Sequence, residues 1–571
     1  MGIDPARLSF YYPSMQRVIT AAEMREIDRL TTERYATPSL LLMEAAANAS
    51  AKAIATRMGG NLKGKRARIL CGRGNNGGDG AALARALWQR GARTDVVLFG
   101  RIDESKGDAR TNFEIVRHLA SYGAGSHAQP PPLSFVECET VHDWEELARP
   151  RSAYDIIVDA LFGTGLTRPL AGVHLQVVEH LAMIREARER AQDSEPLIVS
   201  LDLPSGLNAD SANPVGETAQ ADLTITFTAP KPANVLPPAA HYNGQLIIAN
   251  IGSPPALLEA TASKLFLVEA NDARDWLVET RYLPDSYKNT HGHALIIAGS
   301  RGYTGAAALC ASSAMRSGAG LTTIATPANA QSAVAAQTMP EVITASLSEN
   351  TNGAVSSEAL EQVLQLALRC NVIAIGPGLT SEDDETRAFV REVVERRTMP
   401  VVIDADGLNS LAPWPATLRG SKELPLILTP HTGEMMRLLG TDDKDALNDR
   451  VEVARNFASA HELILVLKGT RTIIAAPDGR VFINPTGNAG LGTAGSGDTL
   501  TGIITGFIAQ AYGALKDRAD ALSAVLAAVY VGGLAGDMAA REIGMRAMVA
   551  SDIREHFGAA IRALDAQGET P

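Results

Sequence analysis

The chain has 571 residues, of which 46% are hydrophobic and 20% are charged, and its formal net charge is −12. This composition is that of a globular protein long enough for two or more domains, and it excludes a disordered or fibrous chain. The acidic balance, with no basic cluster, excludes a role in gripping nucleic acid, although backbone amides and helix ends can still hold small anions.

Neither a secretory leader nor a membrane span is predicted. The first residues, MGIDPARLSFYYPS, contain no apolar segment of the kind found in a secretory signal, and no apolar run reaches the about 18 residues that a membrane span needs. The four cysteines lie far apart and form no CxxC pair, which favours free or buried thiols in a reducing compartment. We therefore expect a soluble cytoplasmic protein.

The first half opens with two predicted helices. In the first, residues 20–35, Thr20 is followed three residues later by Glu23, which is the pattern of a capping box. The second covers residues 38–58. Apolar, strand-like runs then alternate with helical ones, at residues 66–71, 94–99, 154–163, 196–206, 221–230 and 244–252. Short apolar strands separated by helices indicate a parallel, doubly wound sheet.

The alternation breaks at Ser253-Pro254-Pro255 and restarts at about Phe266, which predicts a boundary between two domains. Strand-like runs follow at residues 293–299, 321–327, 371–378, 399–407 and 425–431, and residues 463–485 are expected to form strands joined by a Pro-Asp-Gly turn. Two helices, residues 496–513 and 521–544, close this half. Because no residue-level repeat relates the halves, we expect two different α/β domains, at residues 16–255 and 264–562.

The loop GRGNNGGDG, residues 72–80, lies between a strand-like run and a helical run. Such a turn can hold a phosphate on helix N-terminal amides, or it can serve tight packing alone. Asp159, Asp202 and Ser205 follow two other predicted strands. Because ligand sites lie at the carboxyl ends of parallel strands, these side chains are expected to meet the loop at one crevice. Their oxygen atoms also suit a hard cation.

A second glycine-rich loop, GTAGSGDTLTG at residues 492–502, opens the next-to-last predicted helix. The amides of Ser496 and Gly497 would face an anion there. Asp498 could act as a base on a hydroxyl, or it could merely favour the helix dipole. His431 and Lys468 follow other strand ends of this half. Together these residues predict a nucleotide crevice combined with a site that acts on a hydroxyl group.

The ordered set of motifs resembles the family of bifunctional NAD(P)H-hydrate repair enzymes, from about Val18 to Phe557. The first half carries the motifs GRGNNGGDG, DALFGTGLTRPLAG, DLPSGLN and TFTAPKPANVLPPAAHYNG. The second carries YKNTHGHALIIAGSRGYTGAA, RSGAGL, GPGL, DADGLN, LTPHTGEMMRLLG, KGTRT and NAGLGTAGSGDTLTGII. The resemblance implies a Rossmann-like epimerase domain followed by a ribokinase-like dehydratase domain. At two loop positions the sequence departs from the family pattern: Ala494 and Thr380 stand where glycine is common.

The resemblance also implies the reaction. NADH or NADPH hydrated at the nicotinamide ring exists as R and S epimers, which the first domain interconverts. The second domain dehydrates the S form with ADP or ATP and Mg²⁺, releasing AMP or ADP and phosphate. The choice between ADP and ATP, the preference between the two hydrates and the route of epimerisation stay open, and a homo-oligomer that binds neither nucleic acid nor a membrane is expected.

Family positions carry over to named residues of this sequence. The resemblance makes Asp202 and Asp498 catalytic and assigns a potassium ion to Asn76, Asp159 and Ser205. The residues implied to bind the hydrate are Asn75, Asn76, Gly77, Gly78, Asp79, Gly163, Thr164, Gly165, Leu166, Thr167, Arg168, Pro169, Asp202, Gly305, Ala306, Gly378, His431 and Asp498. Those implied to bind the nucleotide are Lys468, Gly469, Thr470, Arg471, Thr472 and Gly497.

One alternative remains from the residues. A ribokinase-like small-molecule kinase with an N-terminal ligand-binding module would account for the second half. It would leave the glycine loop and the acidic strand ends of the first half without a reaction to perform.

Overall fold

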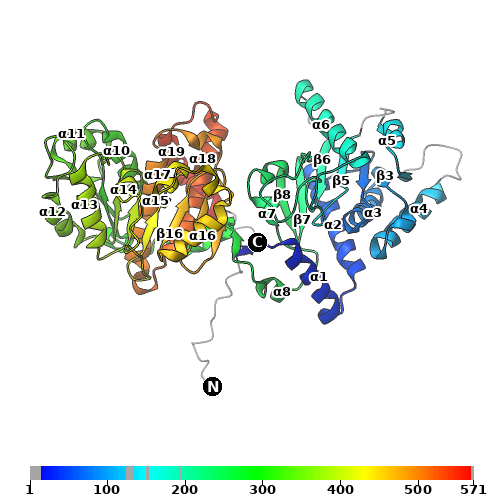
Figure 1. Cartoon of the computed structure of the whole chain (residues 1–571), viewed down its shortest axis with the longest axis horizontal. Coiled ribbons are helices and arrows are strands. Elements are labelled where there is room, and N and C mark those ends of the chain that lie inside the picture. Colours follow the sequence, from blue (N-terminus) through cyan, green and yellow to red (C-terminus); the bar gives the residue numbers. More distant parts are fainter. Residues whose placement is uncertain (1–14, 124–132, 149–153, 193–194, 567–571) are drawn as a thin grey trace, which may run out of the picture. The chain divides into compact units, whose positions relative to one another are not determined.

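The structure is a computed structural model that describes residues 15–123, 133–148, 154–192 and 195–566. The chain divides into two compact units, Met1–Ser263 and Lys264–Pro571, which Figure 1 draws in colours that follow the sequence. Each unit has helices packed against a mainly parallel sheet, so the predicted α/β class with two doubly wound domains is confirmed. The limits 16–255 and 264–562 stay a prediction.

The first unit is built on a parallel sheet with strand order β4-β3-β2-β5-β6-β7-β8. The short strand β1 (Gln16–Arg17) is not part of this sheet, whose strands are β2 (Arg66–Cys71), β3 (Arg93–Phe99), β4 (Leu133–Cys138), β5 (Ile156–Ala160), β6 (Leu197–Leu201), β7 (Leu223–Phe227) and β8 (Gln245–Ala249). Its helices are α1 (Ala21–Tyr35), α2 (Ser39–Arg57), α3 (Asn75–Gln89), α4 (Gly107–Gly123), α5 (Val141–Ala148), α6 (Val173–Ala191), α7 (Pro232–Val235) and α8 (Pro255–Glu259).

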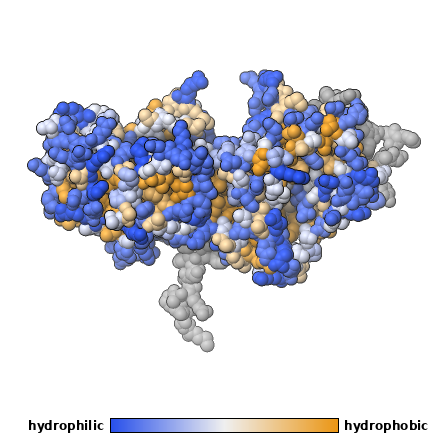
Figure 2. Space-filling view, in the orientation of Figure 1, coloured by the Kyte–Doolittle hydropathy of each residue, from blue (hydrophilic) through white to orange (hydrophobic). Residues whose placement is uncertain are grey.

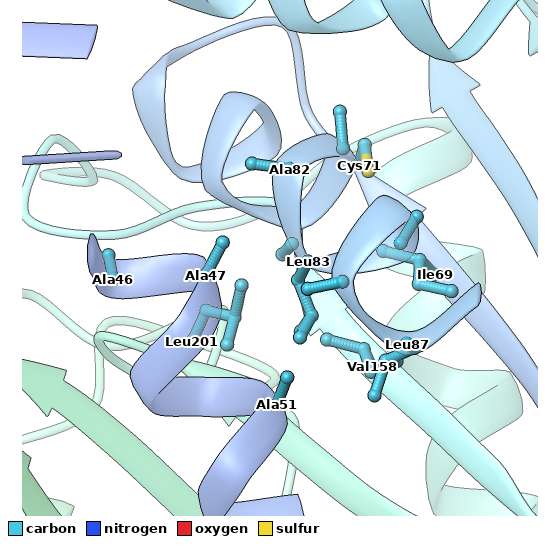
Figure 3. Packing of buried hydrophobic residues seen from close by; sticks show 14 of the residues in the cluster. Ala46, Ala47, Ala51, Ile69, Cys71, Ala82, Leu83, Leu87, Val158 and Leu201 are labelled. Atoms are coloured by element: carbon cyan, nitrogen blue, oxygen red, sulfur yellow. The ribbon is translucent and has the colours of Figure 1, made fainter. Parts of the chain in front are cut away.

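Side chains of the central strands alternate between two hydrophobic layers, which is why these strands are almost wholly apolar. On β2, Ile69 lies in the layer formed with α2, α3 and α4, whereas Leu70 lies in the layer formed with α5 and α6. Figure 3 shows the first layer, where Ala46, Ala47 and Ala51 of α2 lie near α3. Small side chains let these two helices approach closely, so the start of α3 is held firmly over the sheet.

The predicted capping box begins helix α1. The hydroxyl of Thr20 accepts a hydrogen bond from the amide of Glu23 at 3.2 Å, and the Glu23 carboxylate accepts one from the amide of Thr20 at 2.8 Å. Both otherwise unpaired backbone groups are thereby satisfied, and this prediction is confirmed.

The strands of the second unit follow the order β9-β18-β17-β16-β15-β14-β13-β10-β11-β12, parallel from β12 to β16, with an antiparallel hairpin of β17 and β18. The strands are β9 (Leu265–Leu267), β10 (His293–Ile297), β11 (Leu321–Pro327), β12 (Ile343–Leu347), β13 (Val372–Ile375), β14 (Val401–Ile403), β15 (Leu426–Leu428), β16 (Ile464–Leu467), β17 (Ile473–Ala475) and β18 (Val481–Ile483). The helices are α9 (Ala270–Glu279), α10 (Thr304–Arg316), α11 (Ala328–Gln337), α12 (Ala359–Ala367), α13 (Asp384–Glu395), α14 (Asp406–Ser410), α15 (Thr432–Leu439), α16 (Arg450–Ala460), α17 (Ser496–Gln510), α18 (Ala521–Ile543) and α19 (Ala550–Ala566).

Helix α18 is long and apolar enough, by length and composition alone, to cross a membrane, with a mean hydropathy of 1.6. In the folded unit 72% of that stretch is buried, and the helix packs against α9, α17 and α19. It is therefore a core helix of the second unit.

Figure 2 shows hydrophilic residues spread over the visible face of each unit, with apolar residues between them.

Candidate active sites

In the first unit, polar side chains meet at the carboxyl ends of β2, β5 and β6. The strand order reverses between β2 and β5, because β3 and β4 lie on one side and β6 to β8 on the other. Open α/β sheets bind ligands at such a switch point. The structure brings together there the strand ends that carry Asn76, Asp159 and Ser205.

The glycines of the loop after β2 serve close packing. A Cβ atom at Gly72 would lie 2.0 Å from the carbonyl oxygen of Leu161, and one at Gly77 would lie 1.8 Å from the oxygen of Gly72. Only a side chain at Gly74, the N-cap of α3, would meet nothing within 4 Å. The packing interpretation therefore explains most of these glycines. The amides of Asn75, Asn76 and Gly77 still form a helix N-terminus of the kind that binds anions, whereas the amide of Gly78 donates to the oxygen of Gly74 at 3.1 Å.

Asp159 and Asn76 are buried in different hydrogen-bonding states. The Asp159 carboxylate accepts bonds from the Ser205 hydroxyl at 2.6 Å, the Ser205 amide at 2.8 Å and the Ser200 hydroxyl at 2.9 Å. Burial raises the pKa of Asp159, although these hydrogen bonds oppose the rise. In contrast, neither the side-chain nitrogen nor the oxygen of Asn76 has a partner among the described residues. A buried amide without partners indicates a ligand position.

Asp202 is held by a buried lysine. The ammonium group of Lys231, which is 1% exposed, donates to Asp202 Oδ1 at 2.5 Å and to the Thr226 hydroxyl at 2.9 Å. Asp202 Oδ2 lies 3.1 Å from where a Cβ atom of Gly163 would be, so it faces the Gly163 loop. The backbone of Asp202 has a φ of +63°, a conformation that costs free energy and is common at functional sites. One oxygen is thus neutralised and the other faces the crevice.

Two more carboxyl groups share this electrostatic environment. Burial raises the pKa of Asp79 well above its usual value, and the charges of Asp202 and Asp28 add to the rise, while Lys231 opposes it. Burial also raises the pKa of Asp28, on α1, to about 6. Within this group Asp79 is therefore strongly biased toward its protonated form.

The predicted substrate segment from Gly163 to Pro169 follows β5. The Cβ position of Gly163 lies 3.4 Å from the side-chain amide of Asn76 as well as near Asp202, so this glycine joins the site. Leu166 is buried in the hydrophobic layer under α6. Thr164, Gly165, Thr167 and Arg168 form no hydrogen bond to the site among the described residues, and Thr167, Arg168 and Pro169 are exposed. Their assignment to the substrate stays a prediction.

In the second unit, the corresponding group lies at the ends of β14 and β16 and at the start of α17. Asp404 is 1% exposed and accepts hydrogen bonds from Lys468 Nζ at 2.8 Å and from the Thr501 hydroxyl at 2.7 Å. Burial opposes its charge, but the Lys468 ammonium and the hydrogen bonds from Lys468 and Thr501 together hold the pKa of Asp404 below its usual value. A Cβ atom at Gly497 would lie 3.3 Å from Lys468 Nζ, so the first turn of α17 lies against this pair.

Asp498, in that first turn, differs from Asp404. Burial raises the pKa of Asp498 to about 7, with a further rise from the charge of Asp404 and an opposing effect of Lys468. Its side chain forms no hydrogen bond within the described part of the chain. A carboxylate that merely served the helix dipole would have a lowered pKa, which is the opposite of this shift. The geometry therefore favours Asp498 as a group that takes up a proton near neutral pH.

The pattern His431-x-x-Glu434 has a structural role. His431 is the N-cap of α15, where its Nδ1 accepts from the amide of Gly433 at 2.9 Å while Glu434 accepts from the amide of His431 at 2.8 Å. Glu434 Oε2 also lies 3.7 Å from Lys468 Nζ. The histidine side chain is 54% exposed, so the capping box holds its ring at the rim of the site.

The remaining predicted residues surround this group. Gly378 has a φ of +68°, and a Cβ atom there would lie 2.9 Å from the oxygen of Tyr303 and 3.3 Å from the Cβ atom of Ala306. The loop after β13 thus touches the start of α10, where Gly305 and Ala306 lie. These contacts require glycine at position 378.

The loop from Lys468 to Thr472 joins β16 to β17 and is held from outside by Arg450. Its guanidinium donates to the oxygens of Thr470 at 3.3 Å and Lys468 at 3.2 Å. Arg471 donates to the oxygen of Pro485 and has a φ of +57°. The predicted nucleotide loop is therefore fixed through the carbonyl groups of Lys468 and Thr470 and through the amide of Lys468, which donates to the oxygen of Pro430 at 2.8 Å.

The two departures from the family pattern differ in cost. Thr380 has a φ of +65°, which explains why glycine is common there and costs a threonine about 1–2 kcal/mol. Ala494 does not adopt a positive φ, and the left-handed position is taken by Gly495 at +84°. The methyl group of Ala494 therefore causes no backbone strain.

Comparisons with known proteins match both units. Residues 39–233 match the family described as YjeF-related protein N-terminus, and residues 294–557 match NAD(P)H-hydrate dehydratase. The chain is 40% identical to the bifunctional NAD(P)H-hydrate repair enzyme Nnr of Moorella thermoacetica, over 97% of this chain and 98% of that protein. It is 36% identical to the protein of the same name from Thermofilum pendens, over 96% and 97%. The crystal structure of the ADP/ATP-dependent NAD(P)H-hydrate dehydratase of Bacillus subtilis with ATP/Mg²⁺ is 30% identical, with a TM-score of 0.44, over 52% of this chain and 98% of that one.

These matches cover nearly the whole chain, so the protein is a two-domain enzyme in which an epimerase unit precedes a dehydratase unit. The chain belongs to the family of bifunctional NAD(P)H-hydrate repair enzymes. The family and activity predicted from the motifs are confirmed. The alternative, a kinase with an appended binding module, does not account for the match of the first unit.

Sequence reasoning did not single out three residues of these sites. Lys231 lies in the motif TFTAPKPANV and Asp404 lies in DADGLN, but neither motif indicates which side chain the residue contacts. Thr501, one turn after Asp498, reads as part of an apolar helix. Asp404 could have been found because it directly follows a strand, as Asp202 does. Lys231 could not, because its partner lies in another loop.

Proposed function

We propose that the second unit removes the hydroxyl group of the S hydrate after transferring to it a phosphoryl group from ADP or ATP. The observation that supports this most is Asp498, an unpaired carboxyl group with a pKa raised to about 7 by burial, beside Lys468 and the start of α17. Gly305, Ala306, Gly378 and His431 would hold the hydrate. The loop from Lys468 to Thr472 and Gly497 would hold the nucleotide.

In the first step Asp498 accepts the proton of the substrate hydroxyl while the hydroxyl oxygen bonds to the terminal phosphorus. The bond between that phosphorus and the nucleotide's bridging oxygen breaks, and AMP or ADP leaves. The amides of Ser496 and Gly497 stabilise the transferring phosphoryl group. Mg²⁺ bound to the nucleotide would neutralise part of its phosphate charge. The electron pair of the ring nitrogen then expels phosphate, and loss of a proton from the adjacent carbon restores NAD(P)H.

The first unit is proposed to interconvert the R and S hydrates. The open start of α3, from Asn75 to Asp79, would bind substrate phosphate through backbone amides, and the Gly163 loop would cover the ring. Epimerisation by ring opening or by loss and return of water requires a proton donor and acceptor beside the carbon that carries the hydroxyl. Asp202 Oδ2 faces the crevice and is assigned that role.

A potassium ion is proposed to lie at Asn76, Asp159 and Ser205. These residues offer only oxygen ligands, and the side-chain oxygen of Asn76 is buried without a partner among the described residues. Burial raises the pKa of Asp159, so a cation beside it would offset the cost of its charge. The donor set therefore fits a hard monovalent cation, which would help to hold the substrate's phosphate groups.

The proposal also includes a cytoplasmic homo-oligomer whose partners are the hydrate and an adenine nucleotide alone. The net charge of −12 argues against nucleic acid as a partner, and free cysteines at positions 71, 138, 310 and 370 fit a reducing compartment.

The test is incubation of the protein with a mixture of R and S hydrates, with ADP and ATP in separate reactions. We expect consumption of both epimers, release of free phosphate and recovery of reduced-nicotinamide absorbance. Accumulation of a phosphorylated hydrate without recovery of NAD(P)H would instead identify a kinase. In Asp202→Ala the S form should still be dehydrated while the R form persists; consumption of the R form at the wild-type rate would remove Asp202 from the mechanism.

A further inference from the structure

A cavity of the dehydratase unit lies outside the residues assigned above. Its volume is about 430 Å³, and the side chains that matter to its chemistry are Ser381, Arg387, Asn409, Arg437 and Asp442. Two guanidinium groups therefore line one cavity together with a single carboxylate, in a chain whose net charge is −12.

The Nε atom of each arginine donates a hydrogen bond that fixes the guanidinium group, and the two terminal nitrogens of each group remain available to a ligand in the cavity. Arg437 Nε donates to Asn409 Oδ1 at 2.8 Å, and Arg387 Nε donates to the oxygen of Ser381 at 2.7 Å. Within the described residues, neither guanidinium forms an ion pair, and no terminal nitrogen of either has a hydrogen-bond acceptor. In contrast, Arg419 pairs with Glu462 at 3.0 Å. Oriented guanidinium groups with free donors suit phosphate oxygens.

The cavity adjoins the reaction site through shared elements. Arg437 and His431 belong to the same helical segment, and Arg437 NH1 lies 3.8 Å from the Cβ position of Gly433, two residues after His431. On the opposite side, Ser381 donates to Asp406 at 3.0 Å, and the charge of Asp406 contributes to the raised pKa of Asp498. The cavity thus follows the loops after β13, β14 and β15, the strands whose ends carry the reaction site.

We propose that this cavity is the subsite for the phosphate groups of the hydrated dinucleotide, with Arg387 and Arg437 as their ligands. The inference rests on the proposed function of the second unit. The adenine nucleotide has Lys468 and the start of α17 for its own phosphates. The hydrate carries two bridging phosphates, and NADPH hydrate also carries a 2′-phosphate, so it needs a separate set of cationic donors near the ring site.

The experiment measures steady-state dehydration of S-NADH hydrate and S-NADPH hydrate by the full chain, at saturating adenine nucleotide. The variants are Arg387→Gln, Arg437→Gln and the double variant, with Arg437→Lys to retain the charge. Arg419→Gln removes an exposed, paired arginine of the same unit and is the matched control. Thermal melting of each variant shows whether the unit is folded.

In the double variant we expect KM for the hydrate to rise about tenfold or more with kcat little changed, because a remote phosphate contact contributes equally to ground and transition states. KM for the adenine nucleotide should be unchanged, and Arg437→Lys should retain part of the affinity. A rise for NADPH hydrate alone identifies the 2′-phosphate as the ligand, and a rise for both hydrates identifies the bridging phosphates.

Two results contradict the inference. In a folded, active double variant, KM values for both hydrates within about twofold of those of the Arg419→Gln control exclude the subsite, because charged hydrogen bonds contribute more than that. A rise in KM for the adenine nucleotide alone assigns the arginines to the other substrate. Failure of the wild-type chain to dehydrate either hydrate is a different outcome, because it refutes the proposed function and the subsite with it.

Discussion

Each unit buries one lysine against one aspartate at the carboxyl ends of its strands, but the role of that aspartate differs. In the epimerase unit Lys231 donates at 2.5 Å to Asp202, the carboxylate that faces the substrate crevice. In the dehydratase unit Lys468 donates at 2.8 Å to Asp404. The candidate base there, Asp498, forms no such pair, and burial raises its pKa to about 7.

This difference separates two uses of a carboxyl group. An ammonium at hydrogen-bond distance fixes the orientation of its carboxylate, as for Asp202 and Asp404, and in Asp404 it also helps to hold the pKa below its usual value. A buried carboxyl group without that partner can take up and release a proton near neutral pH, as for Asp498. Phosphoryl transfer to a hydroxyl requires removal of its proton, which is the chemistry that the second arrangement serves. The predictions below test whether the lysine pairing makes this distinction.

The largest effect is expected for Asp498→Asn. The amide cannot accept the hydroxyl proton, so dehydration should slow by a factor of about 10²–10⁴. The epimerase activity of the same protein should be unchanged, because Asp498 belongs to the other unit. Both rates are measured on one preparation, by following the R and S hydrates separately. A dehydration rate within about tenfold of wild type would assign the base to another residue.

The second prediction compares Lys231→Met with Lys468→Met. Each change leaves a buried carboxylate without its partner, so the free energy of unfolding of that unit should fall by about 3–5 kcal/mol. Lys231→Met should impair epimerisation alone and Lys468→Met dehydration alone. Calorimetric unfolding combined with the two activity assays measures both effects.

The matched controls are Lys231→Met/Asp202→Asn and Lys468→Met/Asp404→Asn. These double variants remove the uncompensated charge and should recover part of the lost stability without recovering activity. If the single variants are as stable as wild type, the pairs are not the electrostatic centres described here.

The central strands could be predicted from sequence, and so could the edge strand β8, whereas the edge strands β4 and β12 could not. β5 and β6 are buried on both faces, so their apolar runs are unmistakable. β4 and β12 were not predicted because both are edge strands in which polar residues, such as Glu137 and Ser346, interrupt the apolar run. Membership of an edge strand depends on its neighbour, and the sequence of the strand itself carries little of that information.

Site residues could likewise be predicted where the local sequence marks them, and not where their role depends on contacts made by the fold. Asn76, Asp202 and Asp498 were found because they lie in glycine-rich loops or directly after strands. Lys231 was not, because its contact with Asp202 spans 29 residues and depends on the fold. The raised pKa of Asp498 also depends on its neighbours in space, Asp404 and Lys468, rather than on any local pattern.

A smaller effect separates two glycines of the first loop. A Cβ atom at Gly77 would lie 1.8 Å from the oxygen of Gly72, whereas one at Gly74 would meet nothing within 4 Å. Gly77→Ala should therefore destabilise the epimerase unit by about 1–3 kcal/mol and reduce epimerisation, and Gly74→Ala should be close to neutral. Chemical denaturation measures the difference. Equal stability of the two variants would show that the loop shifts to make room for a methyl group.

Near neutral pH the smallest effect is the pH dependence of dehydration. Because burial raises the pKa of Asp498 to about 7, its carboxyl group is protonated below that pH and cannot act as a base. The kcat/KM of dehydration should therefore fall by up to about tenfold for each unit of pH below 7 and level off above it. Steady-state dehydration measured across this pH range checks the prediction.

Stability provides an independent check on the same group. The folded state retains the proton of Asp498 between its usual pKa of 3.8 and about 7, whereas the unfolded state has released it. The contribution of Asp498 to the free energy of unfolding therefore decreases as pH rises through that window. In Asp498→Asn this part of the pH dependence should disappear. If the variant and the wild type lose stability in parallel across the window, the acid limb of dehydration belongs to another group.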